Sequence, residues 1–123
     1  MFVLLEHQTD SGVHWDLMIE LPGGTKLATW RLAENPITWK GAAITAEPLG
    51  DHRRIYLDYE GDIGRGRGSV RRMDRGEARL IRRDAERIVI ELCGRALRGT
   101  YQLASSRHDA VEFTRVAPEP GSV

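Results

Sequence analysis

The sequence predicts an all-β fold, a small closed antiparallel β-barrel, and three observations lead to this expectation. Residues 13–20 alternate strictly, which places Trp15, Leu17 and Ile19 on one face of a strand and the more polar side chains on the other. Short apolar runs recur along the chain, separated by turns that contain glycine, proline or aspartate. The length of 123 residues suits one domain with one core, which we expect over residues 1–116.

The first half of the chain carries four expected strands. They cover residues 2–7, 13–20, 26–32 and 38–46. Pro22-Gly23-Gly24 predicts a turn, Glu34-Asn35-Pro36 a break, and residues 48–52 a loop. Four glycines between residues 61 and 68 predict an irregular or bulged segment.

The second half predicts a meander. Its expected strands cover residues 69–73, 77–82, 87–92, 99–104 and 111–116, with turns at 74–76, 84–85 and 93–94. Residues 77–97 could also form one helix, but the β-branched run Ile88-Val89-Ile90 and its flanking glycines favour strands. The proline-rich residues 117–123 are expected to form a disordered tail.

Composition and charge indicate where the protein works and what it binds. No apolar stretch approaches the roughly 20 residues of a membrane span, the start does not resemble a signal peptide, and the lone Cys93 cannot form an internal disulfide; we therefore expect a cytoplasmic protein. The net charge is zero, but residues 53–98 hold 13 arginines against eight acidic residues. Arginine suits phosphate contacts, although a solvated basic surface or a codon preference would give the same composition.

Three side chains form a candidate metal site. In an extended strand His14 and Asp16 point the same way, and a hairpin across residues 8–12 would bring His7 opposite His14. Nitrogen and oxygen ligands without thiolate suit manganese, iron or zinc, and three protein ligands leave positions open for water or substrate. Because these side chains alternate with Trp15, the site is expected in a groove on the outer surface of the barrel. Spacing alone leaves open an ordinary surface role, since His-x-Asp is common by chance.

Four stretches of the chain carry a family resemblance. They are Phe2-Val-Leu-Leu-Glu-His7 with His14-Trp-Asp16 and Leu17-Met-Ile-Glu20; Leu27-Ala-Thr-Trp30 before a loop at Pro36; Asp51-His52, Tyr56 and Tyr59-Glu60-Gly61; and Arg67-Gly68-Ser-Val70 with the later glycine-marked Asp74-Arg75-Gly76 and Leu97-Arg98-Gly99. Together they span about residues 2–104 and resemble the 3′-phosphoesterase domain of bacterial DNA ligase D, here in a free-standing form.

The resemblance implies a β-barrel that uses a manganese-type ion to trim 3′ ends. Such an enzyme removes a 3′-phosphate or a terminal 3′-ribonucleotide from DNA or RNA-tipped DNA, and leaves a 3′-hydroxyl for repair. By position, His7, His14 and Asp16 match the metal ligands, His52 matches the histidine that touches the phosphate, and Tyr56 matches the tyrosine that supports this histidine. Expected partners in trans are an end-joining ligase, a polymerase or Ku-type proteins.

The chain departs from the family pattern at its anion contacts. Met18 stands where the family has a phosphate-binding arginine, and Glu34 where it has a lysine. The second arginine of the family has no clear counterpart, because the segment before His52 is longer here. Two lost contacts would weaken phosphate binding unless other groups replace them. Arg54, Arg65 and Arg67 are the candidate replacements, and the glycines around the last two would let backbone N–H groups approach an oxyanion.

Two other functions fit parts of the pattern. His14, Asp16 and the later His52 also mimic the two-histidine, one-carboxylate triad of a non-haem iron oxygenase, but that assignment leaves His7 without a role. The departures at Met18 and Glu34 favour a catalytically weak or inactive module that binds 3′ ends without cutting them.

Overall fold

The computed structural model describes residues 1–106 and 110–117, which form β-strands and one short 3₁₀ helix. The elements are β1 (Phe2–Thr9), β2 (Gly12–Glu20), β3 (Leu27–Leu32), β4 (Ile44–His52), η1 (Arg54–Leu57), β5 (Gly61–Asp62), β6 (Ser69–Arg83), β7 (Arg87–Cys93), β8 (Arg98–Ser105) and β9 (Val111–Val116). Apart from residue 117, the expected disordered tail lies outside the described residues. No helix in the described ranges has the length and apolar character that a membrane span requires.

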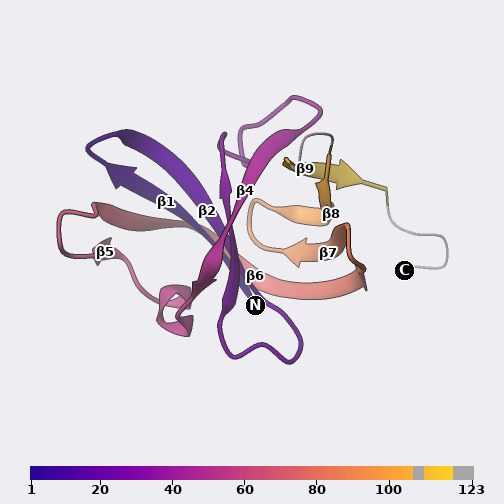
Figure 1. The fold of residues 1–123 in the computed structure, drawn as a ribbon, viewed down its shortest axis with the longest axis horizontal. Helices are drawn as coiled ribbons and strands as arrows, with labels where there is room; N and C mark the ends of the chain where they lie inside the picture. Colours follow the sequence, from indigo (N-terminus) through magenta and orange to yellow (C-terminus); the bar gives the residue numbers. More distant parts are fainter. Residues whose placement is uncertain (107–109, 118–123) are drawn as a thin grey trace.

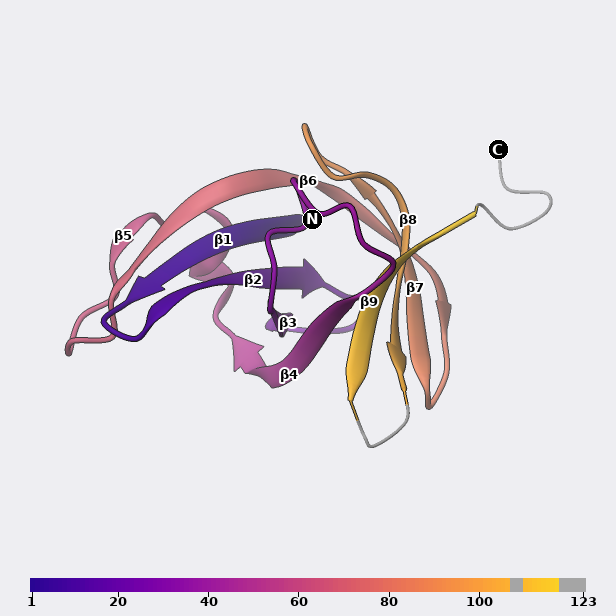
Figure 2. The same cartoon turned by 90° about the horizontal axis from the view of Figure 1, so that it is seen from above.

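The strands confirm the predicted all-β, closed antiparallel architecture. Hydrogen bonding runs in the order β1-β2-β3-β4-β9-β8-β7-β6, and β6 pairs back onto β1, so the described strands close into a ring of eight. The short β5 pairs with the start of β6. Figures 1 and 2 show how the long β6 closes the ring: its first half lies beside β1 and its second half beside β7.

The interior of the ring holds the main apolar core. Leu17 and Ile19 are fully buried there, and Trp15 packs against them half-buried, as the alternation along β2 predicts. Tyr101 and Phe113 stack with ring centroids 5.0 Å apart. Every strand of the ring contributes to this core, which fixes the positions of β1 and β2 from the inside.

A second apolar cluster lies on the opposite face of β1 and β2, outside the ring. Its buried members are Val3, Leu5, Met18, Leu27, Leu57 and Val70. The face therefore points outward as predicted, but Asp16 and Met18 on it are only 3% and 2% exposed. The chain between β4 and β6 covers this face, with Leu57, Tyr56, Tyr59 and Ile63 packed on it.

Two predicted boundaries in the first half are wrong. Residues 48–52 are not a loop but the end of β4, and residues 38–43 are irregular backbone with a turn and a bend rather than the start of that strand. Pro48 fits a strand here because it pairs with Trp30 of β3, whereas β9 pairs with β4 only at residues 44–46. The missing N–H of Pro48 can therefore face an unpaired edge.

The predicted turn at residues 74–76 is also wrong, because β6 runs unbroken from Ser69 to Arg83 with a register shift opposite Leu4 and Leu5. The carboxylate of Asp74 instead accepts four backbone N–H groups, from Arg75 and from residues 95–97. The aspartate thus serves a turn elsewhere in the chain. Residues 77–97 form strands, and the helical alternative does not occur.

Candidate metal centre

The β1–β2 hairpin brings the three candidate ligands together, as predicted. His7 pairs directly with His14 across the hairpin, and Asp16 follows two residues later on the same face. The Thr9 side chain closes the turn, since its hydroxyl donates to the Gly12 carbonyl and accepts from the Ser11 N–H, each at 3.1 Å. The register of one tight hairpin therefore sets the geometry of the site.

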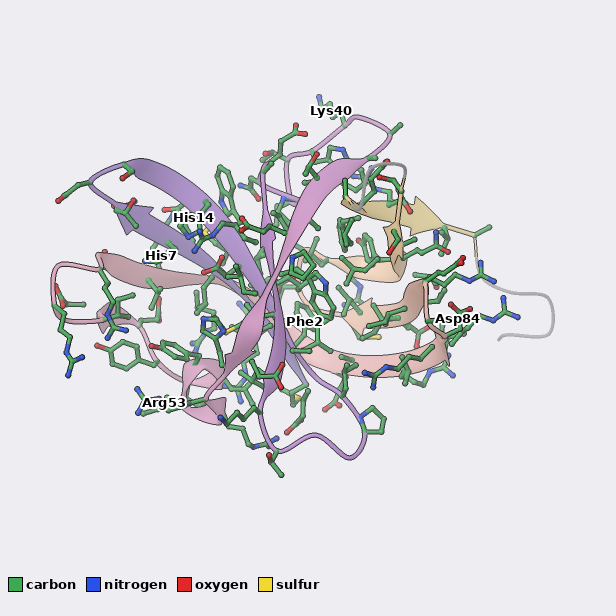
Figure 3. All side chains as sticks on the ribbon, viewed as in Figure 1. Phe2, His7, His14, Lys40, Arg53 and Asp84 are labelled. Carbon is green, nitrogen blue, oxygen red and sulfur yellow. The ribbon has the colours of Figure 1, made fainter. Side chains whose placement is uncertain are left out.

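Nitrogen and oxygen atoms of the three ligands converge on one point. One donor atom from each of His7, His14 and Asp16 lies within 4.8 Å of the other two. The His14 Nε2 atom lies 2.7 Å from His7 Nδ1, and these two nitrogens lie 3.7 and 3.6 Å from the oxygens of Asp16. The two rings meet edge to face, with centroids 4.5 Å apart. Figure 3 shows both histidines together at this hairpin.

His7 is oriented by the loop before β6. Its Nε2 lies 2.7 Å from the carbonyl oxygen of Arg67, and because a carbonyl only accepts, Nε2–H donates and Nδ1 is the acceptor that faces His14 Nε2. Gly68 lets the loop approach so closely, since a Cβ there would collide with the Gln8 carbonyl oxygen. A histidine whose second nitrogen donates to a backbone carbonyl is the arrangement that metal-binding histidines commonly use.

Burial prepares the other two ligands for a cation. Desolvation by burial lowers the pKa of His14, and Arg31 and His7 lower it further against the opposing effect of Asp16. The lowered pKa favours the neutral imidazole, which is the form that binds a metal ion. The Oδ1 atom of Asp16 is buried and has no hydrogen-bond partner among the described residues. A buried carboxylate oxygen without a partner is costly, so the three residues fit a bound metal ion.

Arg31 is a residue of the site that the sequence analysis missed. It pairs with Asp16 across β2 and β3, and its Nε lies 3.6 Å from Asp16 Oδ1, too far for a hydrogen bond. The signal was available in the alternation of residues 27–32, which places Leu27, Thr29 and Arg31 on one face. The site thus has a guanidinium beside the candidate ligands.

A cavity of about 390 Å³ lies over these groups. His7, Asp16 and Arg31 line it together with His52, Tyr56 and Arg67, and Met18 and Val70 contribute apolar surface. The Nδ1 of His52 lies 2.8 Å from the Gly50 carbonyl, so Nδ1–H donates and Nε2 remains available. Tyr56 contacts His52 edge to face, with ring centroids 5.9 Å apart. This contact supports the imidazole through packing.

The three candidate phosphate-binding arginines lie in different places. Arg54 forms an ion pair with Glu20, and neither Arg54 nor Arg65 lines the cavity. Arg65 has a left-handed backbone, with φ 53°. Arg67 does line the cavity, but its guanidinium donates to the carbonyls of Ile63 and Gly64, at 2.6 and 3.3 Å. Arg67 and the unpredicted Arg31 are therefore the arginines at the cavity.

A family model matches most of the chain. The family model of the DNA ligase D 3′-phosphoesterase domain matches residues 5–105, which include most of β1, all of β2 to β8 and every candidate site residue. Among proteins with curated descriptions, none gives a significant match. Since the matched region covers most of the 123 residues, the chain belongs to the DNA ligase D 3′-phosphoesterase domain family.

Proposed function

We propose that this protein is a metal-dependent 3′-end-processing phosphoesterase that removes a 3′-phosphate or a terminal 3′-ribonucleotide from nucleic acid. The observation that carries the proposal is the convergence of His7, His14 and Asp16 beside a cavity that is also lined by Arg31 and His52. Family membership supports the same reaction class. The product would be a 3′-hydroxyl, and the partners would be a ligase, polymerase or Ku-type protein acting in trans.

His7, His14 and Asp16 would hold the ion, and manganese suits their nitrogen and oxygen donors. A bound divalent ion neutralises charge on a phosphoryl oxygen and makes a water more acidic. His7 is held in the ligating tautomer by the Arg67 carbonyl. His14 stays neutral because burial lowers its pKa. The carboxylate of Asp16 supplies the negative charge that a cation requires.

The remaining side chains would bind and orient the phosphate. Arg31 can donate to phosphoryl oxygens from the cavity wall, and the charge that develops on those oxygens makes such a donor stabilising in the transition state. Arg67 is our second choice, and Arg65 and Arg54 come after it because neither lines the cavity. When its ring carries both protons, His52 could donate from Nε2 to a phosphate oxygen or to the leaving 3′-oxygen, and Tyr56 keeps the ring in place.

The decisive experiment uses manganese and a primer–template with a 3′-phosphate or a 3′-terminal ribonucleotide. We expect release of phosphate or of the nucleotide, and loss of activity in the His14→Ala variant. The Arg83→Ala variant, which changes an exposed arginine of β6 far from the hairpin, is a matched control and keeps its activity. A folded His14→Ala variant with full activity would exclude this site.

A binding module is the second candidate, and the engagement of two arginines favours it. Arg54 forms an ion pair with Glu20, and the guanidinium of Arg67 donates to carbonyls of its own loop. Neither guanidinium can therefore replace the phosphate contact missing at Met18 without a rearrangement. Tight binding of 3′-phosphorylated ends without turnover would support this candidate. The oxygenase alternative gains nothing from the geometry, because among the described residues the metal-type cluster contains His7 and not His52.

A further inference from the structure

We propose that the hollow between η1 and β5 binds the base of the 3′-terminal nucleotide while the adjoining cavity holds its phosphate. This inference rests on the proposed phosphoesterase function and adds a substrate subsite to it. The hollow has a volume of about 190 Å³ and is lined by Arg53, Ile55, Tyr56, Tyr59, Asp62 and Ile63. Tyr56 and Ile63 also line the cavity of His7 and His52, so the two spaces share a wall.

Two tyrosine rings give the hollow an aromatic surface. The centroids of Tyr56 and Tyr59 are 6.1 Å apart and their planes are at 89°. A flat base stacked on one of these rings would meet the edge of the other, and aromatic rings favour both arrangements. The hydroxyl of Tyr59 donates to the Asp62 carbonyl, which holds this ring in place before a ligand arrives. The hollow is therefore preorganised for a planar aromatic group.

The size and the rim of the hollow also suit a base. A volume of 190 Å³ is below the roughly 300–1,000 Å³ of pockets for drug-sized ligands, so it suits a single ring system. Ile55, at 55% exposure, is one of two exposed large hydrophobic side chains in the described residues. Arg53 and Asp62 at the rim offer a donor and an acceptor, since the Asp62 carboxylate uses only its Oδ1 for the Gly64 N–H.

A nucleotide is the occupant that fits both spaces at once. A 3′-nucleotide carries an anionic phosphate on one side of its sugar and an aromatic base on another. The two spaces offer the matching surfaces, with arginine and histidine in the cavity and tyrosine and isoleucine in the hollow. Stacking on aromatic side chains tolerates every base, so we expect the site to require a base without selecting one strongly.

The test compares two oligonucleotides that carry a 3′-phosphate and differ only in whether the terminal sugar has a base. With the manganese-loaded wild type we expect the base-free oligonucleotide to bind about tenfold more weakly. A second probe places the fluorescent base 2-aminopurine at the 3′ terminus, where stacking on tyrosine should quench its emission. Equal affinities for the two oligonucleotides together with unquenched emission would overturn the proposal.

Variants assign the effect to the hollow. Tyr59→Leu and Ile55→Ala should reduce the tenfold preference to about twofold or less, and Tyr59→Phe should retain most of it because the ring remains. Val13→Ala removes the other exposed large hydrophobic side chain, at the β1–β2 hairpin, and should keep the wild-type preference. Thermal unfolding of each variant shows whether it is folded. A folded Tyr59→Leu variant with an undiminished preference contradicts the proposal.

Binding and turnover are measured separately, so this proposal and the proposed function can fail independently. Turnover without any base preference would leave the phosphoesterase standing and exclude the base subsite. A base preference without turnover would support the subsite within a binding module. No binding of either oligonucleotide would exclude both.

Discussion

Two aspartates are buried among the described residues, and the surroundings of their carboxylates differ. Asp74 is 5% exposed, and its two oxygens accept four backbone N–H groups at 2.7 to 3.1 Å. Asp16 is 3% exposed, and its Oδ1 has no hydrogen-bond partner among the described residues. Around Asp16 lie side chains rather than backbone, namely two histidines and Arg31 at 3.6 to 3.7 Å.

The contrast separates a structural carboxylate from a ligand. The Asp74 carboxylate joins β6 to the turn after β7, and its acceptor capacity is filled by the fold itself. The Asp16 carboxylate is buried without that compensation, so the fold bears its desolvation cost and leaves an oxygen available. A bound cation would offset this cost. The two residues should therefore respond differently to the same substitution.

The largest expected effect is on catalysis, in the Asp16→Asn variant. Loss of the negative charge on this ligand weakens the binding of the metal ion directly, and we expect the rate of 3′-phosphate removal to fall at least about 100-fold. Without metal, the free energy of unfolding should stay within about 1 kcal/mol of wild type, because Oδ1 has no hydrogen bond to lose. Steady-state kinetics and urea unfolding measure the two quantities. A folded variant with wild-type activity would remove Asp16 from the site.

The Asp74→Asn variant should show the reverse. An amide places an NH₂ group against two backbone N–H donors, so we expect a loss of about 2–4 kcal/mol in the free energy of unfolding. The activity of the molecules that remain folded should change little at low temperature. Urea unfolding measures the loss, and an unchanged midpoint would contradict the structural role of Asp74.

Metal binding should distinguish the two variants by stability. An ion that binds only the folded state stabilises it by about 2.7 kcal/mol at a concentration 100 times its dissociation constant. Manganese should therefore raise the melting temperature of wild type and of Asp74→Asn by similar amounts, and raise that of Asp16→Asn much less. Chelation should reverse the shift. Equal shifts in all three proteins would mean that manganese binds elsewhere.

The pair of aspartates also shows what could be predicted from the sequence. The alternation in residues 13–20 and the hairpin register placed His7, His14 and Asp16 together, because both rules depend on neighbours along the chain. The sequence predicts a local turn at Asp74, since Asp-Arg-Gly has the composition of one. Three of its four partners lie 21 to 23 residues away, and no local rule identifies them.

The same limit explains the missed arginine. Arg31 reaches the site through the pairing of β2 with β3, so its place depends on a register across the six residues between those strands. Arg54 and Arg65 are candidate phosphate-binding residues only because they lie near His52 or near glycines in the sequence. Whether Arg31 replaces the contact missing at Met18 remains a prediction, which the Arg31→Lys variant can test through a rise in KM for the phosphate-bearing substrate.

The smallest expected effect comes from a third carboxylate on β2, that of Glu20, which is partly exposed and fully paired. A hydrogen bond from the N-terminal ammonium, followed by one from Arg54, lowers the pKa of Glu20 below its ordinary value of 4.5. A lowered pKa in the folded state stabilises the protein above the ordinary pKa, and this stabilisation is lost as the pH falls through the lowered value.

Because the pair is open to solvent, Glu20→Gln should cost only a few tenths of a kcal/mol at pH 7. The difference from wild type should close as the pH falls below 4.5, and added salt at pH 7 should narrow it as well. Urea unfolding of the two proteins from pH 7 to pH 3 checks this. The Glu20→Gln variant also removes the ion-pair partner of the Arg54 guanidinium. If Arg54 can then reach the phosphate, the KM for 3′-phosphorylated ends should fall in Glu20→Gln. The fall should be absent in the Glu20→Gln/Arg54→Ala double variant.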